Sequence, residues 1–126
     1  MKLRFRLLPA LYSVARLPPH APLPEWPPGK DLYSVTRTSS EISVVCLEGS
    51  EPEGAAVQAG WMAIELEGPI AFELTGVAAE LTRSLASRSI SVFVLSTFDT
   101  DYVLVPGSKG DEAVLALTAD GHERIT

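Results

Sequence analysis

Two aspartates in the second half of the chain have the type and spacing to bind a charged ligand. Asp99 and Asp101 belong to the polar run Ser-Thr-Phe-Asp-Thr-Asp, residues 96–101, which lies between two apolar segments. A carboxylate at such a bend can accept a charge-assisted hydrogen bond from an ammonium group. Aspartates are also common in bends as turn formers or as caps of backbone groups. The sequence leaves both interpretations open.

The other chemistry-bearing residues do not form a catalytic or metal-binding set. No serine or cysteine is paired with a nearby histidine, and the sequence contains no phosphate-binding loop. His20 and His122 are far apart, with no cysteine or acidic residue at ligand spacing. We therefore expect no enzyme activity, no bound metal and no cofactor.

Composition narrows the class of protein further. The 126 residues suffice for one ordinary domain or two small packed ones, and 46% of them are apolar. Ten scattered lysines and arginines and a net charge of −6 argue against a nucleic-acid partner, which would require a basic footprint. The single cysteine, Cys46, excludes an internal disulfide and suits a reducing cytoplasm.

The N-terminus superficially resembles a signal peptide, with Lys2, Arg4 and Arg6 before an apolar run. The charges alternate with apolar residues at period two, as in a half-exposed strand, and Pro9 and Arg16 shorten the run. We expect an extended segment over residues 3–17 that is interrupted at Pro9. No stretch approaches the length that spans a bilayer, so a membrane partner is not expected.

In the first half, residues 32–38 and 41–47 predict a hairpin with a bend at Ser39 and Ser40. The preceding segment, residues 17–29, contains six prolines and predicts a rigid loop. Residues 48–60 are rich in glutamate, glycine and alanine and predict a surface connection, with a short helical turn at 55–58.

The second half predicts an alternation of strands and helices. We expect a strand at 61–66, a helix at 75–87 capped by Thr75, a hairpin at 93–105, a second helix opened by a capping box of Ser108 and Asp111, and a final strand at 122–126. Strand, helix, strand, strand, helix, strand is the ferredoxin-like order, an α+β fold with an antiparallel sheet and two helices on one face.

The two hairpins match weakly in pattern at a spacing of sixty residues, which suggests two diverged copies of one unit. The strands of the hairpin at 93–105 are largely apolar on both faces and would need cover on both. We therefore predict a degenerate N-terminal unit over residues 1–60, its first helix reduced to the proline loop, and a complete C-terminal unit over residues 61–126.

This chain resembles the ACT-domain superfamily, and more narrowly the small tandem-ACT proteins related to the cytosolic arginine sensors of animals. The resemblance is carried by residues 94–105, Val-Leu-Ser-Thr-Phe-Asp-Thr-Asp-Tyr-Val-Leu-Val, together with residues 67–70 and 32–38. It implies a non-catalytic regulatory module that binds an amino acid or similar small metabolite at an interface between ACT units. Apolar strand edges would favour a homodimer.

The chemistry of an amino acid fits this expectation. The N-terminus of the predicted helix at 75–87 offers backbone N–H groups to a carboxylate, and the aspartates can accept from an ammonium group. The ligand-binding residues implied by the resemblance and by this chemistry are Ile70, Phe72, Leu74, Thr75, Gly76, Thr97, Phe98, Asp99 and Asp101. The alternative is a structural or protein-interaction module with a vestigial pocket.

Overall fold

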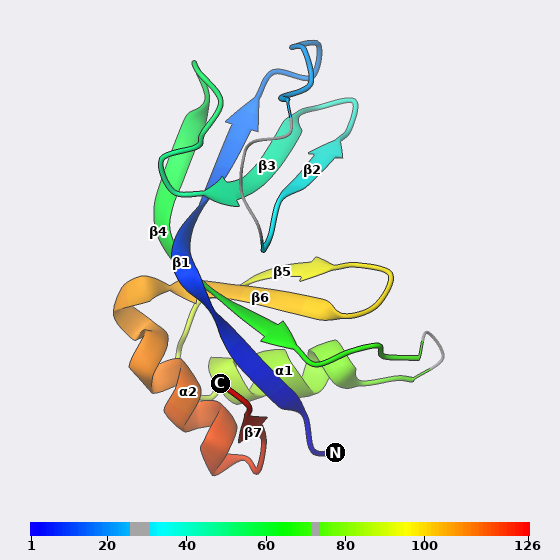
Figure 1. Ribbon diagram of the computed structural model, residues 1–126, viewed down its shortest axis with the longest axis vertical. Coiled ribbons are helices and arrows are strands. Elements are labelled where there is room, and N and C mark those ends of the chain that lie inside the picture. Colours follow the sequence, from blue (N-terminus) through cyan, green and yellow to red (C-terminus); the bar gives the residue numbers. More distant parts are fainter. Residues whose placement is uncertain (26–30, 72–73) are drawn as a thin grey trace. The chain divides into compact units, whose positions relative to one another are not determined.

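The computed structural model describes residues 1–25, 31–71 and 74–126, which fall into two compact units. Unit 1 combines Met1–Pro9 with Met62–Thr126, and unit 2 is Ala10–Trp61. Two long strands, β1 (Arg4–Leu17) and β4 (Ala56–Leu66), contribute residues to both units (Figure 1). Whether unit 2 is a second, degenerate ACT-like unit stays a prediction.

Unit 1 has the element order predicted from residue 61 onward. After β4 come the elements α1 (Val77–Ala86), β5 (Phe93–Ser96), β6 (Asp101–Pro106), the short 3-10 helix η1 (Gly107–Lys109), α2 (Gly110–Ala119) and β7 (Glu123–Arg124). β5 and β6 pair antiparallel, and the strands are ordered β1-β4-β6-β5. The predicted α+β class, with an antiparallel sheet and two helices, is confirmed.

The start of the chain lies between β4 and β7 in this sheet. The backbone N–H of Glu67 donates to the carbonyl of Arg4 at 2.8 Å. The predicted final strand is reduced to the two residues of β7, which pair parallel with Arg4 and Phe5 of β1. Residues 4–9 thus complete the sheet of unit 1 from the opposite end of the sequence.

The core of unit 1 lies between the sheet and its two helices. In α1, Val77, Leu81 and Leu85 are buried at the predicted i, i+4 spacing. They join buried side chains of β1, β4, β6 and α2, among them Phe5 and Leu117. Burial of such side chains supplies the main favourable term in the folding of this unit.

Charged pairs occupy other side-chain positions of β1 and β4. Arg4 contacts Glu67 at 2.6 Å, and Arg6 contacts Glu65 at 2.9 Å. The hydroxyl of Tyr102 on β6 donates to the second carboxylate oxygen of Glu65 at 2.6 Å. These outward residues alternate along each strand with the buried ones, as the pleat requires.

Unit 2 contains the predicted first hairpin, made of β2 (Ser34–Arg37) and β3 (Ile42–Leu47). β3 also pairs antiparallel with β1, from Tyr12 opposite Leu47 to Leu17 opposite Ile42. Cys46 lies in the core of this unit, and burial raises the pKa of its thiol, which keeps it in the unreactive protonated form.

Local predictions fail in four places. β1 runs through Pro9 without interruption, because Pro9 lies between the stretches that pair with β7 and with β3, where no partner strand needs its missing N–H. The helical turn at 55–58 is wrong, since β4 begins at Ala56. Neither Thr75 nor the box of Ser108 and Asp111 caps a helix; α1 and α2 begin after Gly76 and Lys109 without a side-chain cap.

In the parts of the chain that the structure describes, no helix is both long and apolar enough to cross a membrane. The same residues contain no group of three or more histidine, cysteine or acidic side chains arranged to hold a metal ion.

A buried histidine attaches the start of the chain to α1. His122 accepts a hydrogen bond from the backbone N–H of Leu3 at Nδ1 (3.0 Å), and its Nε2 lies 2.9 Å from a carboxylate oxygen of Glu80. Because Nδ1 is an acceptor, the neutral ring carries its hydrogen on Nε2 and donates it to Glu80. One fully buried side chain therefore links the N-terminus, β7 and α1.

We predict that His122→Ala lowers the free energy of unfolding by about 2 kcal/mol, because it leaves the buried amide of Leu3 without its acceptor. Urea denaturation followed by circular dichroism measures the change. The exposed His20→Ala is the matched control and should leave the midpoint unchanged. Equal midpoints for the two variants would refute a structural role for His122.

Acid should also destabilise the protein. The hydrogen bond from Arg83 lowers the pKa of Glu80, and the hydroxyl of Ser13 lowers the pKa of Glu51. A carboxyl whose folded-state pKa lies below its unfolded value stabilises the fold above the unfolded pKa and loses that contribution as pH falls through the folded one. We expect the urea midpoint to drop below about pH 4.5, an ordinary glutamate pKa.

Glu80→Gln should make the urea midpoint fall less steeply with decreasing pH. Glu53→Gln, at an exposed position, should leave the pH dependence unchanged. A midpoint that stays constant from pH 6 to pH 3 would contradict the prediction.

Candidate functional site

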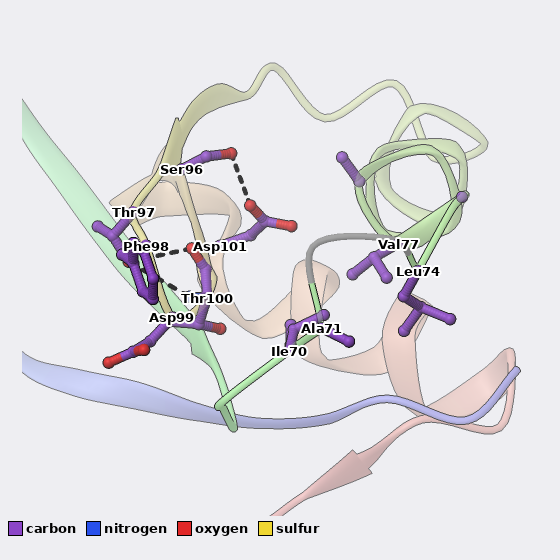
Figure 2. A pocket seen from close by; sticks show the side chains of 12 residues that line it. Ile70, Ala71, Leu74, Val77, Ser96, Thr97, Phe98, Asp99, Thr100 and Asp101 are labelled. Atoms are coloured by element: carbon purple, nitrogen blue, oxygen red, sulfur yellow. Dashed lines mark hydrogen bonds between the residues drawn. The ribbon is translucent and has the colours of Figure 1, made fainter.

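A pocket of about 330 Å³ opens in unit 1 between the start of α1 and the bend that joins β5 to β6. Figure 2 shows its lining side chains extending from these two stretches. The lining residues are Ile70, Ala71, Leu74, Gly76, Val77, Ala78, Ser96, Thr97, Phe98, Asp99, Thr100 and Asp101. All of them belong to unit 1, although they come from two segments distant in sequence.

Most of the residues predicted from the sequence meet at this pocket. Those that line it are Ile70, Leu74, Gly76, Thr97, Phe98, Asp99 and Asp101. Phe72 lies outside the described residues, and Thr75 is not part of the lining. That these residues bind a ligand remains a prediction.

Sequence reasoning missed five lining residues: Ala71, Val77, Ala78, Ser96 and Thr100. Ser96 and Thr100 stand inside the polar run and were discernible as hydroxyl neighbours of the aspartates. Val77 and Ala78 form the first turn of α1. They would have been predicted as lining residues if the helix had been predicted to begin after Gly76.

Backbone hydrogen bonds hold the bend in a defined shape. The N–H of Thr97 donates to the carbonyl of Thr100 at 2.8 Å, and the Thr100 hydroxyl donates to the carbonyl of Leu66 at 2.8 Å. The N–H of Ile70 donates to the carbonyl of Asp99 at 2.7 Å. The bend is thereby fixed to the loop that follows β4, and both walls of the pocket keep their spacing.

Gly68 makes this close approach possible. A Cβ atom at Gly68 would lie 2.9 Å from the carbonyl oxygen of Asp99 and 3.2 Å from the Cβ of Thr100. Because the nearer atom belongs to the backbone, a side chain here would push the loop away from the bend. Glycine is therefore required for steric reasons at this position.

One wall of the pocket presents the N-terminus of α1. Gly76 adopts a left-handed conformation with φ of 81°, and the first intrahelical bond runs from the N–H of Glu80 to the Gly76 carbonyl at 2.9 Å. The N–H groups of Val77, Ala78 and Ala79 thus have no partner within the helix, and no side chain of the described residues caps them. Such a terminus favours a negatively charged group.

The opposite wall presents a carboxylate. Asp101 accepts a hydrogen bond from the Ser96 hydroxyl at 2.6 Å, which holds its side chain in place. In Figure 2 the Asp101 carboxylate extends toward α1, whereas that of Asp99 points away from the helix. Of the two aspartates, Asp101 is the one whose charge faces the pocket.

The rest of the lining combines the hydroxyl residues Ser96, Thr97 and Thr100 with apolar side chains. Ile70, Leu74 and Val77 form an aliphatic surface beside the helix N-terminus. Leu74 is 52% exposed, and Phe98, at 78%, is more exposed than the other large apolar side chains that the structure describes. Exposed apolar groups gathered around a cavity are typical of a contact surface.

Two family models match this chain. A family model described as the ACT domain matches residues 56–119, and a second, described as an N-terminal domain, matches residues 10–54. No curated protein matches the sequence significantly.

Among solved structures, the Agobacterium tumefaciens protein Atu0741 is 33% identical, with a TM-score of 0.90 over 99% of this chain and 93% of its own. A Vibrio cholerae protein of unknown function is 19% identical, with a TM-score of 0.74 over 94% of this chain and 89% of its own. The regulatory subunit of aspartate kinase from Thermus thermophilus is 11% identical, with a TM-score of 0.65 over 91% of this chain and 95% of its own. The last two likenesses concern the fold alone.

The bond from Thr100 to Leu66 can be tested by substitution. Thr100→Val preserves the shape of the side chain and removes the hydroxyl that donates to the Leu66 carbonyl. We expect a loss of about 1 kcal/mol in the free energy of unfolding and faster hydrogen exchange at the amide of Ile70. Thr100→Ser keeps the hydroxyl and should show neither effect. Unchanged exchange in Thr100→Val would show that this bond does not hold the bend.

Proposed function

The chain belongs to the ACT-domain family, and on that premise we propose that it is a regulatory module that binds an amino acid or a similar small metabolite and has no catalytic activity of its own. The observation that carries the proposal is the pairing of opposite charges across one pocket. The N-terminus of α1 lies on one side and Asp101 on the other.

This arrangement suits a zwitterion. The carboxylate of an amino acid can accept hydrogen bonds from the N–H groups of Val77 and Ala78, where the helix dipole also favours it. The ammonium group can donate to Asp101 in a charge-assisted bond. A volume of about 330 Å³ lies at the small end of ligand pockets and suits a ligand of this size.

The proposal extends to the assembly predicted from the sequence. The exposed Leu74 and Phe98 leave the pocket open on one side, and a second ACT unit would close it. We therefore propose that the ligand binds at an interface between ACT units, in a cytoplasmic protein that forms a homodimer. The narrower relationship to the arginine sensors of animals stays a prediction from residues 94–105.

Phe98 favours a second candidate function. An aromatic side chain that is 78% exposed at the tip of a bend is typical of a surface that contacts another protein. In a pure interaction module, the pocket would be vestigial and no amino acid would stabilise the fold. Ligand-induced stabilisation therefore separates the two functions.

We predict that at least one of the twenty amino acids raises the melting temperature in a concentration-dependent manner. A ligand at one hundred times its Kd stabilises the folded state by about 2.7 kcal/mol. Asp101→Asn should abolish the shift, because the amide keeps a hydrogen-bond acceptor for Ser96 but loses the charge that would hold the ammonium group.

Asp99→Asn is the matched control, since the Asp99 carboxylate points away from α1. It should retain the shift. If no amino acid stabilises the protein at millimolar concentration, the sensor proposal is wrong and the interaction module takes its place.

A further inference from the structure

The charges around the pocket restrict which amino acids it can hold. The described lining residues include two carboxylates, Asp99 and Asp101, and no lysine, arginine or histidine. An acidic ligand side chain would therefore find no side-chain cation among them and would meet the like charge of Asp101, so its two carboxylates would share the one helix N-terminus.

The nearest alternative source of positive charge is already paired. Lys2 and Arg4 line a neighbouring cavity of about 290 Å³, which shares Ile70 and Leu74 with the pocket. Arg4 contacts Glu67 at 2.6 Å, and Lys2 contacts Glu123 at 3.1 Å. Both cations thus already have carboxylate partners, which reduces their attraction for an acidic ligand side chain.

A basic side chain is disfavoured for a different reason. Only Asp101 extends toward α1, and the ammonium group of the bound amino acid would use it. The Asp99 carboxylate also lines the pocket but points away from the helix, so a second cation placed over Ile70, Leu74 and Val77 would lose water without facing a second carboxylate.

The apolar side chains of the pocket favour an apolar ligand side chain. Among the described lining residues, Leu74 and Phe98 are the two large apolar side chains that are exposed, at 52% and 78%, and the half-buried Ile70 belongs to the same lining. An apolar ligand side chain placed on Ile70 and Leu74 would remove their apolar area from water. Resting on the proposed function, we infer that the pocket selects amino acids with a neutral, apolar side chain and rejects acidic and basic ones.

Titration calorimetry with four probes tests this selectivity: L-leucine, L-alanine, L-glutamate and L-lysine. We expect L-leucine to bind at least about tenfold more tightly than L-glutamate and L-lysine, the scale of discrimination that an apolar pocket achieves. Leu74→Ser should lower the affinity for L-leucine about fivefold to tenfold. The affinity for L-alanine should stay within about twofold of its value in the unaltered protein.

Leu115→Ser is the matched control, because Leu115 is a 57% exposed leucine on α2 that does not line the pocket. It should bind all four probes as the unaltered protein does. Both leucines are exposed, so neither substitution should prevent folding.

The outcomes separate the two proposals. If none of the probes or of the other amino acids binds, the proposed function fails and the selectivity fails with it. If binding occurs and depends on Asp101 but L-glutamate or L-lysine equals or exceeds L-leucine, the function stands and the selectivity is wrong. An equal loss for L-leucine and L-alanine in Leu74→Ser would likewise overturn the role of the aliphatic surface.

Discussion

The site depends on one backbone contact between two distant segments. The N–H of Ile70 donates to the carbonyl of Asp99, and Gly68 permits the approach because any Cβ there would meet that carbonyl. This bond joins the loop after β4 to the bend between β5 and β6. The residues that it joins, Ile70 and Asp99, both line the pocket between α1 and Asp101.

A second constraint gives unit 1 its stability. The start of β1 lies between β4 and the two-residue strand β7, and His122 holds it through Leu3. The network continues from His122 to Glu80 and from Glu80 to Arg83, which bonds both carboxylate oxygens of Glu80. Buried polar groups of this kind are stable only when each is satisfied, so the start and the end of the chain depend on each other.

The sequence predicted those helices and strands whose apolar residues recur at regular spacing. The spacing of Val77, Leu81 and Leu85 identified α1, and the polar bend between apolar runs identified the hairpin that carries Asp101. The place of the N-terminal strand could not be predicted, because a pairing between opposite ends of a chain leaves no local signal. The start of β4 was missed because residues 56–59 are all exposed and show no alternation. The start of α1 was missed because a left-handed Gly76 replaces the expected side-chain cap.

The described lining of the pocket carries hydroxyl groups and one carboxylate directed toward α1. Ser96 donates its hydrogen to Asp101, yet among the described lining residues no histidine is available to carry a proton between them. What the pocket offers are fixed donors and one fixed acceptor, the features that orient a zwitterion without transforming it. A ligand bound to both the helix N-terminus and Asp101 would connect α1 to the bend between β5 and β6. This link would add to the hydrogen bond from Ile70 to the Asp99 carbonyl. Occupancy would then appear as rigidity of the pocket, a change that a regulatory module can transmit to whatever contacts its exposed Phe98.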